Sequence, residues 1–140
     1  MPLAKTIDVL TPDVFEARLT EGLALAKKAE AKLLVLITSD ADDEGVKWCG
    51  DCAEADPVVE EVLAAAEETV VMVRAFCKRS EYSLSVDPKN ADYLFRKDPR
   101  LCIVAIPTLI AWGADGPTGQ RLVEGQCKSA DHVKLLLEDE

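Results

Sequence analysis

Two cysteines three positions apart stand out in the segment Trp48-Cys49-Gly50-Asp51-Cys52. The first thiol comes where a loop gives way to a predicted helix, so it lies at the helix N-terminus. There the unpaired backbone N–H groups and the positive end of the helix dipole stabilise a thiolate, which is the attacking form of cysteine. The second thiol is close enough to displace a mixed disulfide formed on the first. The spacing therefore predicts disulfide exchange, with Cys49 as the nucleophile and Cys52 as the resolving thiol.

The same cysteine spacing also forms half of a structural zinc site, which requires two more ligands. The sequence offers His132 as its one histidine and three further cysteines, Cys77, Cys102 and Cys127, which are isolated from one another. We therefore expect no metal and no other cofactor. Cys102 lies in an apolar run and is predicted to be buried in the core, as cysteine often is. Cys77 and Cys127 lie nearer to polar residues, which leaves their burial open.

Apolar patterns along the chain predict the elements that position this dithiol. The uninterrupted run Leu33–Thr38 is typical of a strand buried on both faces. From Ala55 to Ala66 apolar residues recur at helical spacing, which predicts an amphipathic helix beginning near Cys49. The other expected strands are 7–10, 69–73, 103–112 around Pro107 and 121–124, and the other expected helices are 12–30, 90–97 and 129–137. This alternation predicts an α/β fold, a central mixed β-sheet with helices on both faces.

Length and composition limit the class of protein. With 140 residues, of which 49% are hydrophobic, the chain is expected to form a single domain over residues 1–140 that buries a core. Its net charge of −10 argues against binding to nucleic acid or to anionic membranes, because both require a basic patch. The chain does not begin like a signal peptide, and no apolar run reaches the roughly 20 residues of a membrane span. The odd number of cysteines, five, fits a reducing compartment, so we expect a soluble cytoplasmic protein.

The negative charge is concentrated around the dithiol. Residues 33–73 contain eleven acidic side chains and one basic side chain, Lys47, so this segment carries the whole net charge of −10. The seven acids from Asp40 to Asp56 are near enough to act at the dithiol, because screening limits the reach of a charge to about 8 Å at physiological salt. Either this charge serves solubility, or it disfavours anionic substrates.

The motif Trp-Cys-x-x-Cys resembles the active-site motif of the thioredoxin superfamily, and two other features support the resemblance. Pro57 follows Cys52 by five positions, where thioredoxins kink the active-site helix. The segment Ile106-Pro107-Thr108 is similar to the cis-proline segment of the superfamily. The resemblance implies a thioredoxin-like fold.

Within the superfamily, the chain most closely resembles the Clot family of thioredoxin-related proteins, also described as thioredoxin domain-containing protein 17-like proteins. That family has Trp-Cys-Pro-Asp-Cys, an insertion before this motif, and an acidic residue and a proline after it. Here Asp51, the loop 40–47 and Asp56-Pro57 match these features. Further similarity at 87–97, 105–109 and 122–127 extends the match over nearly the whole chain.

The resemblance implies a cytosolic disulfide reductase whose substrate range is narrower than that of thioredoxin. The ring of Trp48 is expected beside the dithiol as a docking surface, and the backbone of Ile106 beside Pro107 is expected to hold the substrate chain. The oxidised Cys49–Cys52 pair would then be reduced by a thioredoxin-reductase system or by a low-molecular-weight thiol. Expected substrates are disulfide-containing proteins or small disulfides such as cystine, and we expect a monomer.

Residues next to the cysteines are expected to tune them. Gly50 replaces the family's proline and matches ordinary thioredoxins. Thioredoxins also carry a buried Asp in the strand before the motif, which is thought to assist proton transfer. The matching position here is about Leu36, which is not an acid. Proton transfer would therefore need water or another group, and Asp51 is the nearest candidate. Asp51 is alternatively a helix first-turn acid, and as an anion it should disfavour a thiolate at Cys49. Lys47, the one basic residue near the motif in sequence, either stabilises the thiolate or is solvated.

Two other functions remain open on the sequence alone. In a redox-sensing binding module, the oxidation state of Cys49 and Cys52 would control association with a partner, and disulfide turnover would be slow. In a structural zinc protein, the same cysteines would bind metal. A disulfide reductase is favoured because the motif, the cis-proline segment and the predicted fold agree.

Overall fold

Five strands form one mixed sheet in the computed structural model, which describes residues 3–138. The strands are β1 (Leu3–Val9), β2 (Lys32–Ser39), β3 (Val70–Cys77), β4 (Thr108–Gly113) and β5 (Gly116–Val123), in the spatial order β1-β3-β2-β4-β5. β1, β3 and β2 run parallel, whereas β4 and β5 are antiparallel to their neighbours, which confirms the predicted mixed sheet. At its centre, Val35 of β2 pairs with Val73 of β3 and with Ile110 of β4.

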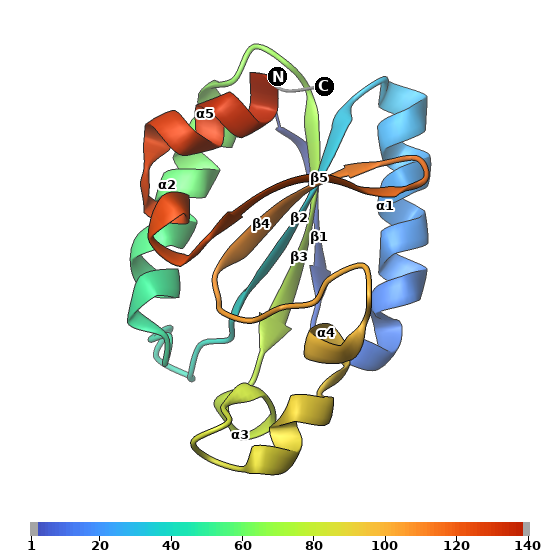
Figure 1. Cartoon of the computed structure of the whole chain (residues 1–140). Helices are drawn as coiled ribbons and strands as arrows, with labels where there is room; N and C mark the ends of the chain where they lie inside the picture. Colours follow the sequence, from blue (N-terminus) through green and yellow to red (C-terminus); the bar gives the residue numbers. More distant parts are fainter. Residues whose placement is uncertain (1–2, 139–140) are drawn as a thin grey trace.

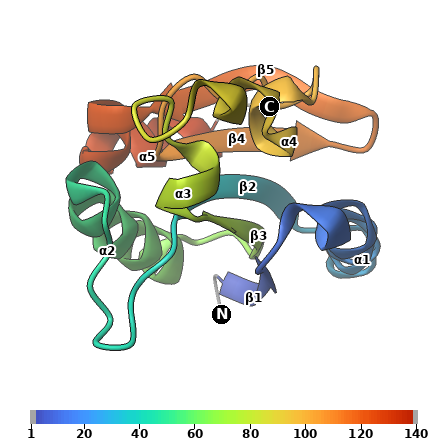
Figure 2. The ribbon, with the colours of Figure 1, turned by 90° about the horizontal axis from the view of Figure 1, so that it is seen from below.

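Helices cover both faces of the sheet, as predicted (Figure 1). The helix α1 (Phe15–Ala29) lies on one face, and α2 (Gly50–Ala65) and α5 (Ala130–Glu138) lie on the other. The short helices α3 (Arg79–Tyr82) and α4 (Leu94–Lys97) lie at the end of the molecule where α2 begins (Figure 2). The 3₁₀ helices η1 (Pro12–Val14), η2 (Pro88–Asp92) and η3 (Glu124–Lys128) lie in the connections.

The central strand β2 is buried on both faces because a core forms on each side of it. Leu33, Val35 and Ile37 pack into the core on the α1 side, and Leu34 and Leu36 pack into the core on the α2 side. None of these five side chains is more than 4% exposed. The uninterrupted apolar run that predicted a doubly buried strand therefore serves two separate cores.

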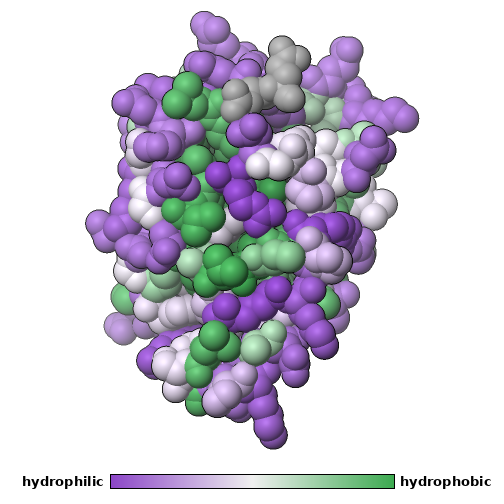
Figure 3. All heavy atoms as spheres, viewed as in Figure 1, coloured by the Kyte–Doolittle hydropathy of each residue, from purple (hydrophilic) through white to green (hydrophobic). Residues whose placement is uncertain are grey.

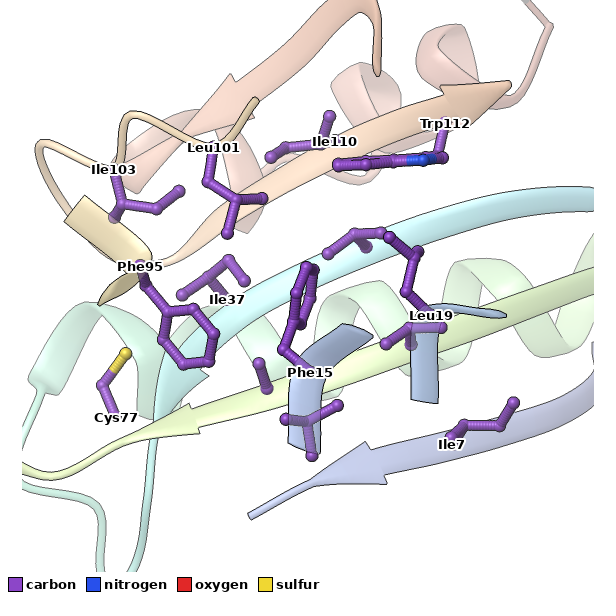
Figure 4. Close-up of a cluster of buried hydrophobic side chains, with 14 of the residues drawn as sticks. Ile7, Phe15, Leu19, Ile37, Cys77, Phe95, Leu101, Ile103, Ile110 and Trp112 are labelled. Carbon is purple, nitrogen blue, oxygen red and sulfur yellow. The ribbon is translucent and has the colours of Figure 1, made fainter. Parts of the chain in front are cut away.

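The core on the α1 side joins segments that are distant in sequence (Figure 4). Phe15 at the start of α1 and Phe95 of α4 meet edge to face, with ring centroids 5.6 Å apart. Leu101 and Ile103, from the loop that follows α4, and Trp112 of β4 complete this core. Trp112 is thus a packing residue of this core.

The loop before β4 corrects two predictions. The strand expected over 103–112 begins only at Thr108. Leu101 and Ile103 are buried, but Cys102 between them is exposed, so its predicted burial in the core is wrong. Cys102 has a φ of 45°, in the left-handed region, and the chain turns there so that its two neighbours point inward while its thiol faces solvent.

Two other boundaries also differ from the predictions. The helix expected over 90–97 is divided at Tyr93, whose ψ of 135° interrupts the helical backbone between η2 and α4. The short strand expected at 121–124 is the end of the longer strand β5. A turn at Gly116, whose φ of 125° favours glycine, brings β5 back along β4.

Hydrophilic side chains make up most of the outline of the face in Figure 3, and hydrophobic ones gather in patches toward its middle. Among residues 3–138, no helix combines the length and the apolar character needed to cross a membrane. Apolar side chains that do reach solvent include Val104, which is 78% exposed in the loop before β4.

The contact between α1 and β3 yields a stability prediction. A Cβ added at Gly22 would lie 2.7 Å from Cγ2 of Val73, which is a stiff β-branched side chain in a central strand. We expect Gly22→Ala to lower the free energy of unfolding by about 1–2 kcal/mol, because overpacking outweighs the gain in helix propensity. Urea denaturation would measure this, with Gly125→Ala as the control, since a Cβ at Gly125 meets nothing within 4 Å. Equal stability of the two variants would contradict the tight packing.

Candidate dithiol site

The two cysteines of the motif lie in contrasting environments at the start of α2. Cys49 is the N-cap residue of α2 and is partly exposed, whereas Cys52 is 0% exposed in the first helical turn. The backbone N–H of Cys52 donates to Sγ of Cys49 at 3.3 Å. This N–H and the positive end of the helix dipole favour negative charge on the outer sulfur. The pair therefore has an accessible sulfur suited to carry charge and a second thiol beneath it.

The loop before β4 lies against the outer cysteine. The Ile106–Pro107 peptide bond is cis, as the resemblance implied, and the thiol of Cys49 lies 3.8 Å from the carbonyl oxygen of Ile106. The carbonyl oxygen of Pro107 accepts the backbone N–H of Glu124 at 2.7 Å and the thiol of Cys127 at 3.7 Å. The η3 segment thus holds this loop beside the dithiol.

The ring of Trp48 is half-buried beside the motif, as expected. Its Nε1–H donates to Oδ1 of Asp40 at 2.9 Å and to the carbonyl oxygen of Cys77 at 3.0 Å. The ring also lies near that of Tyr82, with centroids 6.0 Å apart. These contacts fix the indole at the edge of the site rather than leaving it free.

Lys47 forms an ion pair with a buried acid of α2. Its Nζ lies 2.9 Å from Oδ2 of Asp56 and donates to the carbonyl oxygen of Ser39 at 2.6 Å. The hydroxyl of Thr38 donates to the same carboxylate, at 3.0 Å from Oδ1 and 2.9 Å from Oδ2. Neither of the two sequence-based readings of Lys47, a thiolate partner or a solvated side chain, describes this ion pair.

Asp56 is the buried acid that the sequence analysis missed. It is 7% exposed and lies four positions after Cys52, which places both side chains on one face of α2. The strand position at which thioredoxins carry a buried acid is Leu36 here, and the buried acid lies on the helix instead. The i, i+4 spacing of Cys52 and Asp56 was the available signal.

Asp51 forms an ion pair with a basic residue that lies far from it in the sequence. Its Oδ1 lies 2.7 Å from Nζ of Lys128 in η3, which also lies 3.4 Å from Oε2 of Glu54. Lys47 is therefore not the only cation near the motif. Lys128 and Glu54 are 74 positions apart, and only the packing of η3 on α2 joins them.

The position between the cysteines is open. A Cβ at Gly50 would meet nothing within 4 Å, and Cys49 before it is extended, with φ −102° and ψ 111°. An extended residue is what a following proline requires, and the first helical position tolerates proline. The backbone is therefore compatible with both the glycine of this chain and the proline of the Clot motif.

The remaining surroundings of the site hold thiols rather than a cluster of metal ligands. All five cysteines are free thiols, and Cys77 and Cys127 are fully buried. Among residues 3–138, no group of three or more His, Cys, Asp or Glu side chains is arranged to hold a metal ion. A hollow of about 850 Å³ lies at the opposite end of β2, lined by residues such as Leu33 and Trp112, and does not adjoin the dithiol.

The fold and the dithiol site together define the class of protein to which this chain belongs. A mixed sheet of this order, a dithiol at the start of the helix after β2 and a cis-proline loop beside it belong to a thioredoxin-fold protein. The crystal structure of thioredoxin O1 from Arabidopsis thaliana aligns with this chain at a TM-score of 0.54, covering 95% of each chain with 18% sequence identity. The thioredoxin-like fold expected from the resemblance is therefore confirmed.

Sequence comparisons identify the family within this class. A family model for thioredoxin domain-containing protein 17-like proteins, thioredoxin domain, matches residues 13–139. Human Thioredoxin domain-containing protein 17 is 35% identical over 108 residues, which cover 77% of this chain and 79% of that protein. Thioredoxin-like protein Clot from Oryza sativa subsp. japonica is 32% identical over 137 residues, 94% of each chain. The chain belongs to the thioredoxin domain-containing protein 17-like family, and family and fold support a general thiol oxidoreductase activity.

The buried thiols predict an alkaline loss of stability. Burial raises the pKa of Cys77 and of Cys127 to about 12, and it raises the pKa of Cys52 as well. An unfolded thiol ionises near pH 8.5, so above this pH the unfolded state binds fewer protons than the folded state, and stability falls as pH rises. Between about pH 8 and about pH 10, we expect the reduced protein to lose about 2 kcal/mol for each buried thiol.

Urea denaturation of the reduced protein at the two pH values would measure this loss. The variant Cys77→Ala lacks one of the three thiols, so its loss should be smaller by about 2 kcal/mol. Identical losses in the variant and the parent protein would show that Cys77 does not contribute.

Proposed function

We propose that this protein is a cytosolic disulfide reductase that uses Cys49 as the nucleophile and Cys52 as the resolving thiol. The observation that carries the proposal is the contrast between the two sulfurs. Cys49 is partly exposed at the N-terminus of α2 and accepts the N–H of Cys52, while the Cys52 thiol is fully buried in the turn below it. The five free thiols support a reducing compartment.

The proposed reaction has two exchange steps. The Cys49 thiolate attacks one sulfur of the substrate disulfide, a mixed disulfide forms, and the other substrate sulfur leaves as a thiolate that takes a proton from water. Cys52 then attacks Sγ of Cys49, the mixed disulfide breaks, and the second substrate sulfur leaves. The substrate gains two electrons, and the Cys49–Cys52 pair is oxidised to a disulfide. A thioredoxin-reductase system or a low-molecular-weight thiol restores the dithiol.

We assign substrate positioning to the residues that surround the outer sulfur. The half-buried ring of Trp48 offers an apolar surface, and the cis bond between Ile106 and Pro107 presents backbone beside Cys49. Disulfide-containing proteins and small disulfides such as cystine are the proposed substrates, over a narrower range than that of thioredoxin.

The charge of the loop before α2 supports this narrower range. Of the seven acids near the motif, Asp56 is neutralised by Lys47, and Asp51 and Glu54 share Lys128. The exposed acids Asp42, Asp43 and Glu44 lie in the loop that precedes Cys49 in the chain. The proposed electrostatic selection therefore depends on the loop rather than on all seven acids.

Loss of the nucleophile tests the assignment. We expect Cys49→Ser to abolish turnover of insulin disulfides or cystine under a regenerating reductant, because a hydroxyl does not carry out thiol exchange. Cys102→Ser should retain the wild-type rate, since this exposed thiol lies outside the dithiol. Undiminished turnover by Cys49→Ser would overturn the proposal. A wild-type protein that oxidises to the disulfide but turns over no faster than a free thiol would support a redox-sensing binding module instead.

Salt dependence tests the electrostatic selection. We expect a cationic disulfide such as cystamine to react faster than an anionic one such as dithiodiglycolate, with a ratio that falls about threefold from low to high salt. Neutralising Asp43 and Glu44 with Asn and Gln should lower the ratio at low salt. Neutralising Glu61 and Glu67 farther along α2 and beyond its end makes the same charge change and should leave the ratio unaltered. A ratio independent of salt would contradict the selection.

A further inference from the structure

A lysine from the C-terminal part of the chain lies against the start of α2, where the dithiol is. Nζ of Lys128 in η3 is 2.7 Å from Oδ1 of Asp51, which stands between the two cysteines in the sequence, and 3.4 Å from Oε2 of Glu54. The lysine that is near the motif in sequence, Lys47, is instead paired with Asp56. Lys128 therefore contacts the first two acids of α2.

Two contacts of η3 fix where Lys128 lies. Its neighbour Cys127 is fully buried, and the Cys127 thiol is 3.7 Å from the carbonyl oxygen of Pro107. The backbone N–H of Glu124, at the start of η3, donates to the same oxygen at 2.7 Å. Because the loop of Pro107 also lies against the outer cysteine, the lysine belongs to a segment that is held beside the dithiol.

Two features of α2 act in opposite directions on the outer sulfur. The backbone N–H of Cys52 and the positive end of the helix dipole stabilise a thiolate at Cys49. The carboxylate of Asp51, two positions later in the same turn, destabilises this thiolate, because like charges repel. An ammonium group on that carboxylate offsets the repulsion. The balance at Cys49 therefore depends on Lys128.

The ammonium group of Lys128 is charged wherever a thiol titrates. The contact with Asp51, and after it the contact with Glu54, raises the pKa of Lys128 above its ordinary value. The side chains of Lys128 and Asp51 are 33% and 41% exposed, and ion pairs that water reaches in this way add little to stability. We therefore expect the protein to fold without this lysine.

We propose that Lys128 is a positioning residue that keeps Cys49 reactive by neutralising the charge of Asp51 beside it. This inference rests on the proposed function, in which the thiolate of Cys49 attacks the substrate disulfide. It adds the residue that sets how much of this thiolate is present at neutral pH. Lys128 acts through the carboxylate of Asp51 and takes no part in the exchange of bonds.

Other ionisable groups around the dithiol must be distinguished from this lysine in a pH profile. Burial raises the pKa of Cys77 and of Cys127 to about 12, and it raises the pKa of Cys52 as well. Burial also raises the pKa of Tyr82 to about 12, so these four groups keep their protons in the range tested. Histidine changes charge in this range, and His132 at the start of α5 is the one histidine of the chain. The charged side chains of the neighbouring elements are Asp40, Asp42, Asp43, Glu44 and Lys47 in the loop before α2, Glu54 and Asp56 on α2, Arg96 on α4, Glu124 in η3 and Asp131 on α5.

The rate at which iodoacetamide alkylates Cys49, followed against pH, tests the proposal with the full reduced chain. The reagent is neutral and reacts with the thiolate, and mass spectrometry identifies the modified residue. Cys102→Ser serves as the parent protein, because the Cys102 thiol is exposed as well. At low salt, we expect Lys128→Met to raise the midpoint of the profile by about 0.5 pH unit and to slow alkylation below the midpoint about two- to threefold. The plateau at high pH should stay within about twofold of the parent, because the thiolate is then fully formed.

Matched variants separate the effect of charge from a structural effect. Lys128→Arg keeps the charge and should keep the midpoint, and Lys134→Met removes an exposed charge from α5 and should leave the midpoint unaltered. Asp51→Asn should lower the midpoint, and Asp51→Asn combined with Lys128→Met should give a midpoint between those of the two single variants. High salt should reduce each shift. The shift caused by Lys128→Met should be the same when His132→Gln is also present.

Two results would overturn the proposal. One is a midpoint in Lys128→Met within about 0.1 pH unit of the parent. The other is a lower plateau without a change of midpoint, which would show that Lys128 acts on structure alone. The proposed function fails on a separate measurement, undiminished turnover of insulin disulfides by Cys49→Ser, so the two failures are distinguishable.

Discussion

The structure depends on the close packing of the first turn of α2 against the end of β2. This contact places one cysteine at the exposed helix N-terminus and the next, three positions on, in full burial. The helix supplies its N–H and its dipole to the outer sulfur, while the inner sulfur is buried in the turn below it. Two identical side chains thereby acquire different chemistry from their position alone. The α1-side and α2-side cores on the two faces of β2 hold the strand rigid, so this difference is built into the fold.

Polar groups around the dithiol are paired across elements rather than spread over the surface. Lys47 neutralises Asp56 inside the molecule, and Lys128 joins Asp51 to η3. The same η3 segment donates hydrogen bonds to the carbonyl oxygen of Pro107 in the cis-proline loop. The loop, the helix and the C-terminal segment are therefore coupled around the dithiol. A strongly acidic sequence thus yields a site that is less acidic than its residue count indicates.

The sequence predicted much of the fold and the centre of the site, for reasons that are local. Three features depend on residues that are close in the chain: the apolar run of β2, the apolar face of α2 and the spacing of the two cysteines. The structure shows the strand buried on both faces and the helix beginning directly after Cys49. The exposed position of Cys102 was not predicted, because an apolar sequence does not reveal that the chain turns through a left-handed residue there. The division of the helix at Tyr93 was missed for a similar reason.

The sequence by itself determined the dithiol, the helix that begins at it, the mixed α/β sheet and a net charge concentrated around the motif. Tertiary structure alone decided which of those charges are free and where a buried acid lies. Periodicity shows which face of a helix an acid occupies, but it does not show what that face meets. Asp56 became a partner of Thr38 only when α2 packed on β2. Ion pairs and hydrogen bonds are formed between elements, so their partners are set by the packing that brings distant residues together.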